Sequence, residues 1–126
     1  MFDDKDHEAP VIYHIVSQAA WDAHQERPTF EAASLADEGF IHCTAEPDMV
    51  RQVANRFYRD ASGPFIIVCI APGRLQAELR WEMADGHLFP HIYGPLNRDA
   101  VAAILPFPRL PDKCFVLPPA LRVSTV

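Results

Sequence analysis

The sequence has 126 residues, which is enough for one domain with a single buried core. Seventeen acidic and eleven basic side chains give a formal net charge of -6, and this argues against a nucleic-acid partner, because nucleic-acid binding draws on clustered lysine and arginine. No apolar run approaches membrane-spanning length, and the acidic start lacks the apolar region of a signal peptide. We therefore expect a soluble cytoplasmic protein with no membrane partner.

The first half of the chain is predicted to alternate strands and short helices. Residues 1–9 are polar and uncapped, which predicts a flexible arm. The run VIYHIV at 11–16 is apolar on both faces and predicts a central, doubly covered strand. Ser17 is a suitable N-cap for a helix from about Gln18 to Gln25, and a second short helix is expected from Glu31 to Ala36, ended by Gly39.

The segment GFIHCT at 39–44 predicts a short strand that leads into a longer helix. Because side chains alternate along a strand, His42 should face away from Cys43. Thr44 is expected to cap the helix, which presents an apolar stripe toward a sheet at these positions: Met49 or Val50, Val53, Ala54 and Phe57. The run FIIVCI at 65–70 then predicts the most deeply buried strand.

The second half is predicted to be richer in strands. A strand over 79–83 and a tight turn at Asp85-Gly86 lead into HLFPHIYG, as in a hairpin. Asn97 to Ile104 is expected to form a capped helix, followed by a last strand at ILPF. The prolines toward the C-terminus predict a surface-wrapping tail over 109–126, packed on a single α+β domain over 10–108.

Three cysteines, Cys43, Cys69 and Cys114, are an odd number and follow no metal-finger spacing. Two of them lie within apolar runs, where a reduced thiol behaves as a small hydrophobe, so core positions are favoured over a catalytic one. The sequence also lacks a GxSxG nucleophile elbow and the GxGxxG and GK[ST] phosphate loops.

Histidines in apolar surroundings are the main functional signal, and His14, His42 and His91 fall on separate predicted strands. Pro90 forbids a regular helix through His87 and His91, and on a strand that spacing is about 13 Å, too long for one metal ion. We therefore expect no metal site. Strands that share a sheet can bring such side chains to one cleft, although each histidine could also be a structural residue satisfied by backbone groups.

A pocket for an aromatic or ribosyl ligand fits this composition better. Tyrosine and tryptophan supply flat faces with polar ends, and Glu82 is the carboxylate most closely surrounded by apolar sequence. Burial of Glu82 would raise its pKa unless a donor meets it. The aromatic candidates are Tyr13, Tyr58, Trp81 and Tyr93.

Taken together, the motifs IYHI, EGFIHCT, ANRFY, LRWE and FPHIYGPLN resemble the bacterial family known as domain of unknown function 952, from about Val11 to Phe107. Members of that family look like compact relatives of the ADP-ribosyltransferases, whose split α+β fold binds NAD between two small sheets. The resemblance implies an ADP-ribosyltransferase-like split sheet with flanking helices and makes NAD a candidate cofactor.

The same resemblance implies roles for individual residues. His14 occupies the place of the histidine that bonds the nicotinamide-side ribose, and GFIHCT is similar to a segment of RNA 2′-phosphotransferases, which implicates His42 and Thr44. Asn55 or Tyr58 is nearest to the tyrosine that stacks on nicotinamide. His91 stands where the transferases carry a catalytic glutamate, and a protonated imidazole would oppose the cation that this carboxylate stabilises.

The leading hypothesis is a domain that binds NAD, ADP-ribose or a nucleotide-like small molecule in a histidine-lined cleft, with transferase or hydrolase chemistry at His14, His42 and His91. The predicted ligand-binding residues are Thr44, Asn55, Tyr58, Trp81, Glu82 and Tyr93. The alternatives are a non-catalytic module that binds a small molecule or a protein, and a domain whose histidines are structural. The natural ligand, the acceptor and the oligomeric state do not follow from the sequence.

Overall fold

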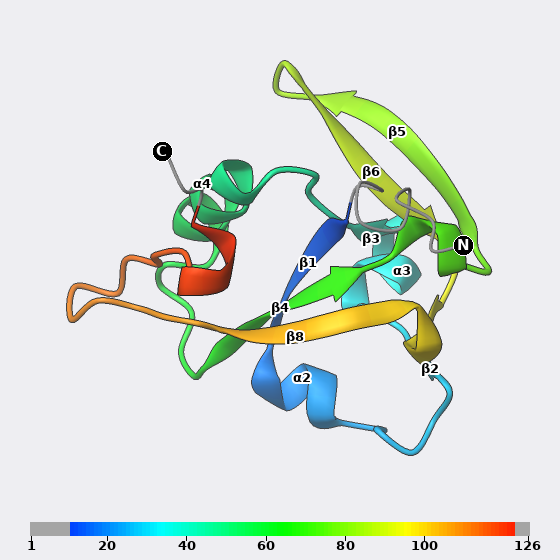
Figure 1. Ribbon diagram of the computed structural model, residues 1–126, viewed down its shortest axis with the longest axis horizontal. Coiled ribbons are helices and arrows are strands. Elements are labelled where there is room, and N and C mark those ends of the chain that lie inside the picture. Colours follow the sequence, from blue (N-terminus) through cyan, green and yellow to red (C-terminus); the bar gives the residue numbers. More distant parts are fainter. Residues whose placement is uncertain (1–10, 123–126) are drawn as a thin grey trace, which may run out of the picture.

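The computed structural model describes residues 11–122 and has the predicted α+β class (Figure 1). The helices are α2 (Gln18–Asp22), α3 (Ala33–Glu38), α4 (Pro47–Phe57) and the 3-10 turns η1 (Pro72–Arg74), η2 (Arg98–Ala100) and η3 (Pro119–Leu121). The strands are β1 (Ile12–Ser17), β2 (Thr29–Phe30), β3 (Ile41–His42), β4 (Phe65–Ile70), β5 (Glu78–Ala84), β6 (His87–Tyr93), β7 (Leu96–Asn97) and β8 (Val101–Phe107). The arm expected over 1–9 lies outside the described residues.

Three small antiparallel sheets make up the fold, with strand orders β1-β4-β8, β2-β7 and β3-β6-β5. The predicted strand at 65–70 is β4, which is central in its sheet and buried throughout. The expectation that β1 is a central strand is wrong, because β1 is an outer strand of its sheet, but both of its faces are covered, as expected. A β-bridge nevertheless covers part of its other edge, where the amides of Tyr13 and Thr44 each donate to the other residue's carbonyl at 2.8 Å. This bridge joins the first sheet to the third.

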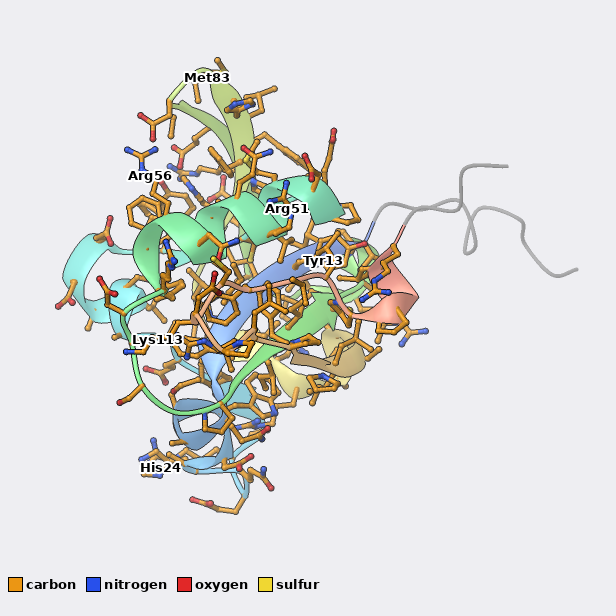
Figure 2. All side chains as sticks on the ribbon, turned by 90° about the vertical axis from the view of Figure 1, so that its left-hand side faces the viewer. Tyr13, His24, Arg51, Arg56, Met83 and Lys113 are labelled. Carbon is orange, nitrogen blue, oxygen red and sulfur yellow. The ribbon has the colours of Figure 1, made fainter. Side chains whose placement is uncertain are left out.

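The β5–β6 hairpin projects from one end of the fold (Figure 1), and an ion pair between Arg56 of α4 and Asp85 (3.2 Å) joins its turn to the helix. Asp85 and Gly86 form its two-residue turn, and both have positive φ (51° and 81°), as a type I′ turn requires. The turn places Ala84 opposite His87 and so fixes the register of the whole hairpin. In Figure 2, Met83 marks this end of the molecule, and His24 lies at the opposite end.

Two apolar clusters cover the two faces of the β1-β4-β8 sheet, following the alternation of side chains along each strand. On one face Val68 packs with Trp21 and with residues of the third sheet, including Ile41 and Ile92. On the other face Ile67 packs with Val50 of α4 and with Phe115 from the C-terminal segment. The core is therefore continuous across the sheet, and each cluster draws on segments distant in sequence.

The helix predicted from Asn97 to Ile104 is wrong: only η2 is helical, and β8 follows it. The alanine-rich sequence favours a helix locally, but β8 pairs with the apolar β4 along its length. Pro106 is tolerated because β8 is an edge strand whose outer side needs no amide donor.

Several element boundaries also differ from expectation. The helix expected to reach Gln25 ends at Asp22, although Ser17 caps it as predicted by accepting a bond from the amide of Ala20 (3.1 Å). Gly39 ends α3 with φ 90°, as predicted. Thr44 does not cap α4, because its backbone is committed to the bridge with Tyr13, and Pro47 begins the helix instead.

The stripe of α4 is buried at Val50 and Ala54, whereas Phe57 is exposed. Cys43 and Cys69 are core residues, as expected, but Cys114 is only partly buried. No helix within residues 11–122 has the length and apolar character needed to cross a membrane.

The segment after β8 packs against α4 and the first sheet. Phe115 is almost fully buried, in edge contact with Phe65 (5.6 Å between ring centroids) and tilted contact with Phe107 (4.7 Å). The side chain of Asn55 on α4 donates to the Phe115 carbonyl (3.1 Å) and accepts from its amide (2.6 Å). Arg109 stacks on Phe115, with its guanidinium carbon 4.4 Å from the ring centroid. This segment is part of the second apolar cluster.

Candidate functional site

Polar and aromatic side chains gather on one face of the β3-β6-β5 sheet. His42, His91 and Arg80 are direct neighbours across the three strands, so their side chains project from the same face. Phe89 and Glu82 face each other one step nearer the hairpin turn. We call the surface formed by these five residues, with Phe40 and Tyr93, the histidine face.

Glu82 is the centre of the histidine face. Its Oε1 accepts a hydrogen bond from Nδ1 of His91 and another from the hydroxyl of Tyr93, each at 2.7 Å. These two donors, Tyr93 first and His91 second, hold the pKa of Glu82 below its usual value. The bond between Glu82 and the Tyr93 hydroxyl also raises the pKa of Tyr93. Glu82 is therefore an ionised carboxylate near neutral pH.

An ionised Glu82 can only accept, so it fixes the proton of His91 on Nδ1. The His91 side chain is only 9% exposed, and Phe40 stacks on its ring (4.2 Å between centroids, 19° between planes). Its Nε2 makes no hydrogen bond within residues 11–122 and retains some contact with solvent. His91 thus offers an unshared nitrogen lone pair beside a carboxylate.

A second histidine and carboxylate lie next to the first. His42 Nε2 lies 3.0 Å from Glu38 Oε2 at the end of α3, and both side chains are about half exposed. The rings of His42 and His91 are 5.2 Å apart, nearly perpendicular, and Phe40 contacts both. Two imidazoles, each oriented by its own carboxylate, therefore share one surface.

His14 lies behind this surface rather than on it. Its Nδ1 donates to the backbone carbonyl of His42 (2.7 Å), which leaves Nε2 as a bare acceptor, buried and without a partner in residues 11–122. Burial lowers the pKa of His14 to about 4. The bond to the His42 carbonyl opposes this shift, and the His42 imidazole adds a smaller lowering effect. His14 is thus neutral at pH 7 and bonded to the backbone that positions His42. All three predicted histidines come together, but His14 is not accessible.

A shallow groove continues the histidine face toward the hairpin turn. Phe89 lies two residues from His91 on the same strand and face, and it forms one wall of the groove. The opposite wall is α4, and an ion pair between Arg56 and Asp85 (3.2 Å) crosses the outer end. The groove has a volume of about 190 Å³ and is lined by Met49, Gln52, Val53, Arg56, Phe57, Asp85, His87 and Phe89.

A second depression, of about 250 Å³, lies at the other end of the molecule beside α2. Its lining includes His24, Arg27 and Arg98. None of His14, His42 and His91 lines either depression. We consider the groove at α4 the better candidate, because Phe89 connects it directly to the histidine face.

The other predicted ligand-binding residues are spread over the fold. Thr44 is buried at the bridge, where its hydroxyl donates to the Tyr13 carbonyl (3.4 Å), and Asn55 holds the Phe115 backbone. Tyr58 packs against Phe65, and its pKa is raised, first by burial and then by the nearby Glu38 carboxylate. Trp81 is exposed on the opposite face of the hairpin from Glu82. Only Glu82 and Tyr93 of this group lie on the histidine face.

Phe40, Phe89 and Arg80 belong to the face, and Glu38 borders it at His42, but none of the four is among the predicted residues. Phe40 lies just before β3, two positions ahead of His42, and the centroids of the two rings are 4.7 Å apart. Arg80 lies over the Tyr93 ring, with its guanidinium carbon 4.3 Å from the centroid, and bonds Glu78. Among residues 11–122 no three His, Cys, Asp or Glu side chains are arranged to hold a metal ion.

Comparison with known proteins gives a family and a fold. A family model described as "Protein of unknown function (DUF952)" matches residues 15–104. The crystal structure of protein CC0527 from Caulobacter crescentus is similar, with 29% sequence identity and a TM-score of 0.74, over 84% of this chain and 93% of that chain. The solution NMR structure of CC0527 gives 29% identity and a TM-score of 0.67, over 83% and 90%. No curated protein matches.

Proposed function

The chain belongs to the family described as protein of unknown function DUF952, and because that description names no activity, we propose a function from the chemistry of the histidine face. We propose that this face and the adjoining groove bind NAD, ADP-ribose or a similar nucleotide, and that the fold is related to that of the ADP-ribosyltransferases. One observation carries the proposal: the Glu82 carboxylate orients both His91 and Tyr93 beside a groove with aromatic walls.

The groove and the face together present the groups that such a ligand needs. Phe57 and Phe89 supply flat apolar surfaces for a base or nicotinamide ring. Arg56 is a cation at the rim, where a phosphate can bind. The ribose hydroxyls would then meet His91 Nε2 and the exposed imidazole of His42.

The same geometry supports acid–base chemistry. A neutral imidazole whose Nδ1–H is held by a carboxylate accepts a proton at Nε2, and the carboxylate stabilises the imidazolium that forms. In the proposed reaction, His91 takes the proton from a water or acceptor hydroxyl whose oxygen bonds to the ribose C1′ as the bond to nicotinamide breaks. Glu82, from the neighbouring strand, supplies a negative charge beside the position where the resembling transferases carry theirs.

The shallowness of the groove favours a second candidate function. Its volume of about 190 Å³ is below the roughly 300–1,000 Å³ typical of pockets that enclose a small molecule. A reaction that must exclude water is harder to run on so open a surface. A non-catalytic module that binds the same ligand by its ring and phosphates would bind without turnover.

Thermal unfolding with and without ligand tests the binding proposal. A ligand that binds only the folded state stabilises it by about 2.7 kcal/mol at a hundred times its Kd, which raises the Tm by roughly 10 °C in a domain of this size. We expect NAD or ADP-ribose to give this shift. His91→Asn should abolish it, because asparagine can still donate to Glu82 but lacks the Nε2 acceptor.

His24→Asn is the matched control, because His24 is exposed at the far end of the molecule and its φ of 62° suits asparagine. It should keep the full shift. Nicotinamide release from bound NAD then separates the enzyme from the binding module. The proposal would be contradicted by the absence of any shift with NAD and ADP-ribose, or by an equal shift in His91→Asn.

A further inference from the structure

Strand β5 is a long and exposed sheet edge. Within residues 11–122 no segment pairs with its outer side, so a row of backbone donors and acceptors has no strand partner there. Its side chains alternate strictly, with Leu79, Trp81 and Met83 on one face and Arg80 and Glu82 on the other. An edge of this kind is a template for pairing with another strand.

We propose that β5 pairs antiparallel with β5 of a second copy of this chain, about a two-fold axis at Trp81. In this register Trp81 faces Trp81, and Leu79 faces Met83 of the other copy. On the polar face Arg80 lies opposite Glu82 of the second copy, and the symmetry makes this ion pair twice. Apolar side chains therefore meet apolar ones, and Arg80 and Glu82 each meet an opposite charge, while Glu78 faces Ala84.

The neighbouring registers are excluded by the same side chains. A shift of one residue would set the apolar face of one strand against the polar face of the other. Sliding one strand by two residues along the other would place Arg80 opposite Arg80. Sliding it by two residues the other way would place Glu82 opposite Glu82. Like charges directly opposite each other destabilise a strand pair, so one register alone satisfies both faces.

Exposed apolar side chains support the same interface. Trp81 is 46% exposed, Met83 66% and Leu88 55%, and Met83 lies directly opposite Leu88 within the hairpin. The three residues form one stripe toward the hairpin turn, on the face away from Glu82. Two hairpins joined edge to edge would place their stripes side by side on a single six-stranded sheet and shield part of this surface from water.

The second copy would also add a residue to the histidine face. Oε1 of Glu82 accepts both bonds from His91 and Tyr93, whereas Oε2 has no partner in residues 11–122. Arg80 of the second copy, whose guanidinium bonds Glu78 of its own chain in the single copy, would turn to this oxygen, complete the bonding of the carboxylate and help to keep it ionised. This pairing rests on the edge strand alone and does not depend on the proposed ligand.

Sedimentation of the full chain at about 1 to 100 µM, a range that resolves micromolar dimers, tests the pairing. We expect a dimer. Arg80→Glu and Glu82→Arg should each weaken it at least about tenfold, because each sets like charges opposite one another. The double swap Arg80→Glu with Glu82→Arg restores opposite charges in the interface and should recover the dimer. Arg27→Glu makes the same charge change at an exposed site and should have no effect.

Single cysteines test the register without relying on charge. In a Cys114→Ser background, Trp81→Cys places two thiols across the axis at a Cα separation of about 5 Å, which suits a disulfide. Met83→Cys faces Leu79 instead and lies about 13 Å from its own copy, so it should not cross-link. A monomer at all concentrations, a failure of the double swap to restore the dimer, or cross-linking through Met83→Cys rather than Trp81→Cys would overturn the proposal.

Discussion

Acidification from pH 7 to pH 4 should reduce the free energy of unfolding by about 3 kcal/mol through His14 alone. Burial lowers the pKa of His14 from 6.5 to about 4 in the folded protein. The unfolded chain therefore binds the proton first, and the stabilisation is complete above pH 6.5 and lost as the pH falls toward 4. Each unit of difference in pKa is worth about 1.4 kcal/mol, which gives the expected total. Denaturant unfolding at a series of pH values measures it.

The comparison with His14→Asn isolates this contribution from the carboxylates that also titrate in acid. Asparagine can still donate to the His42 carbonyl, but it takes up no proton, so its pH dependence should be weaker by about 3 kcal/mol over the same interval. His24→Asn should retain the pH dependence of the original protein. If His14→Asn and the original protein lose the same free energy, the histidine is not held neutral by burial.

Replacement of Phe115 by alanine should reduce the free energy of unfolding by about 3 to 5 kcal/mol. The ring is 1% exposed and packs against Phe65, Phe107 and the Arg109 guanidinium, so alanine leaves a cavity that fixed neighbours cannot fill. The Phe115 backbone is held by Asn55, which limits the collapse of the segment into that space. Denaturant unfolding again gives the measurement.

Phe57→Ala is the matched control, because it removes the same ring from an exposed position on α4. Its effect on stability should stay within about 0.5 kcal/mol, since alanine also favours the helix. Equal losses in the two variants would show that residues beyond β8 do not belong to the core. A large loss in Phe115→Ala alone would make the C-terminal segment an integral part of the domain.

The elements predicted correctly from the sequence carry strong local signals. The apolar run of β4, the Ser17 cap, the Gly39 end of α3 and the Asp85-Gly86 turn each depend on only a few neighbouring residues. The helix expected at Asn97 failed because long-range pairing with β4 outweighed its local preference. Thr44 failed as a cap for a similar reason, since its bridge partner Tyr13 lies 31 residues away.

Part of the site could be predicted from the turn of the β5–β6 hairpin. A two-residue turn at Asp85-Gly86 sets Ala84 opposite His87, and counting back along both strands places Glu82 opposite Phe89 and Arg80 opposite His91. The proximity of Glu82 to His91 therefore follows from the hairpin register. The approach of β3 does not, because nothing local in GFIHCT indicates which strand it pairs with. That pairing is what brings His42 and Phe40 to His91.

Glu82 changes how the resemblance to ADP-ribosyltransferases is interpreted. Under the proposed relationship, His91 would stand where those enzymes carry a glutamate, and its Nδ1 is 2.7 Å from a carboxylate on the next strand. The pair retains negative charge at this point of the sheet and adds a nitrogen that can accept a proton. On our account the face suits a ribosyl ligand, with Glu82 and His91 acting as a unit.

Mapping a bound ligand onto individual residues distinguishes a ribosyl site on the histidine face from binding elsewhere on the protein. We would titrate the protein with ADP-ribose and follow backbone amide and imidazole NMR signals in the original protein and in His91→Asn. We expect changes concentrated at His42, His91, Tyr93 and the groove residue Phe89, and we expect them to be lost in the variant. Changes confined to the depression around Arg27 and Arg98, or changes that persist unaltered in His91→Asn, would contradict a ribosyl site on the histidine face.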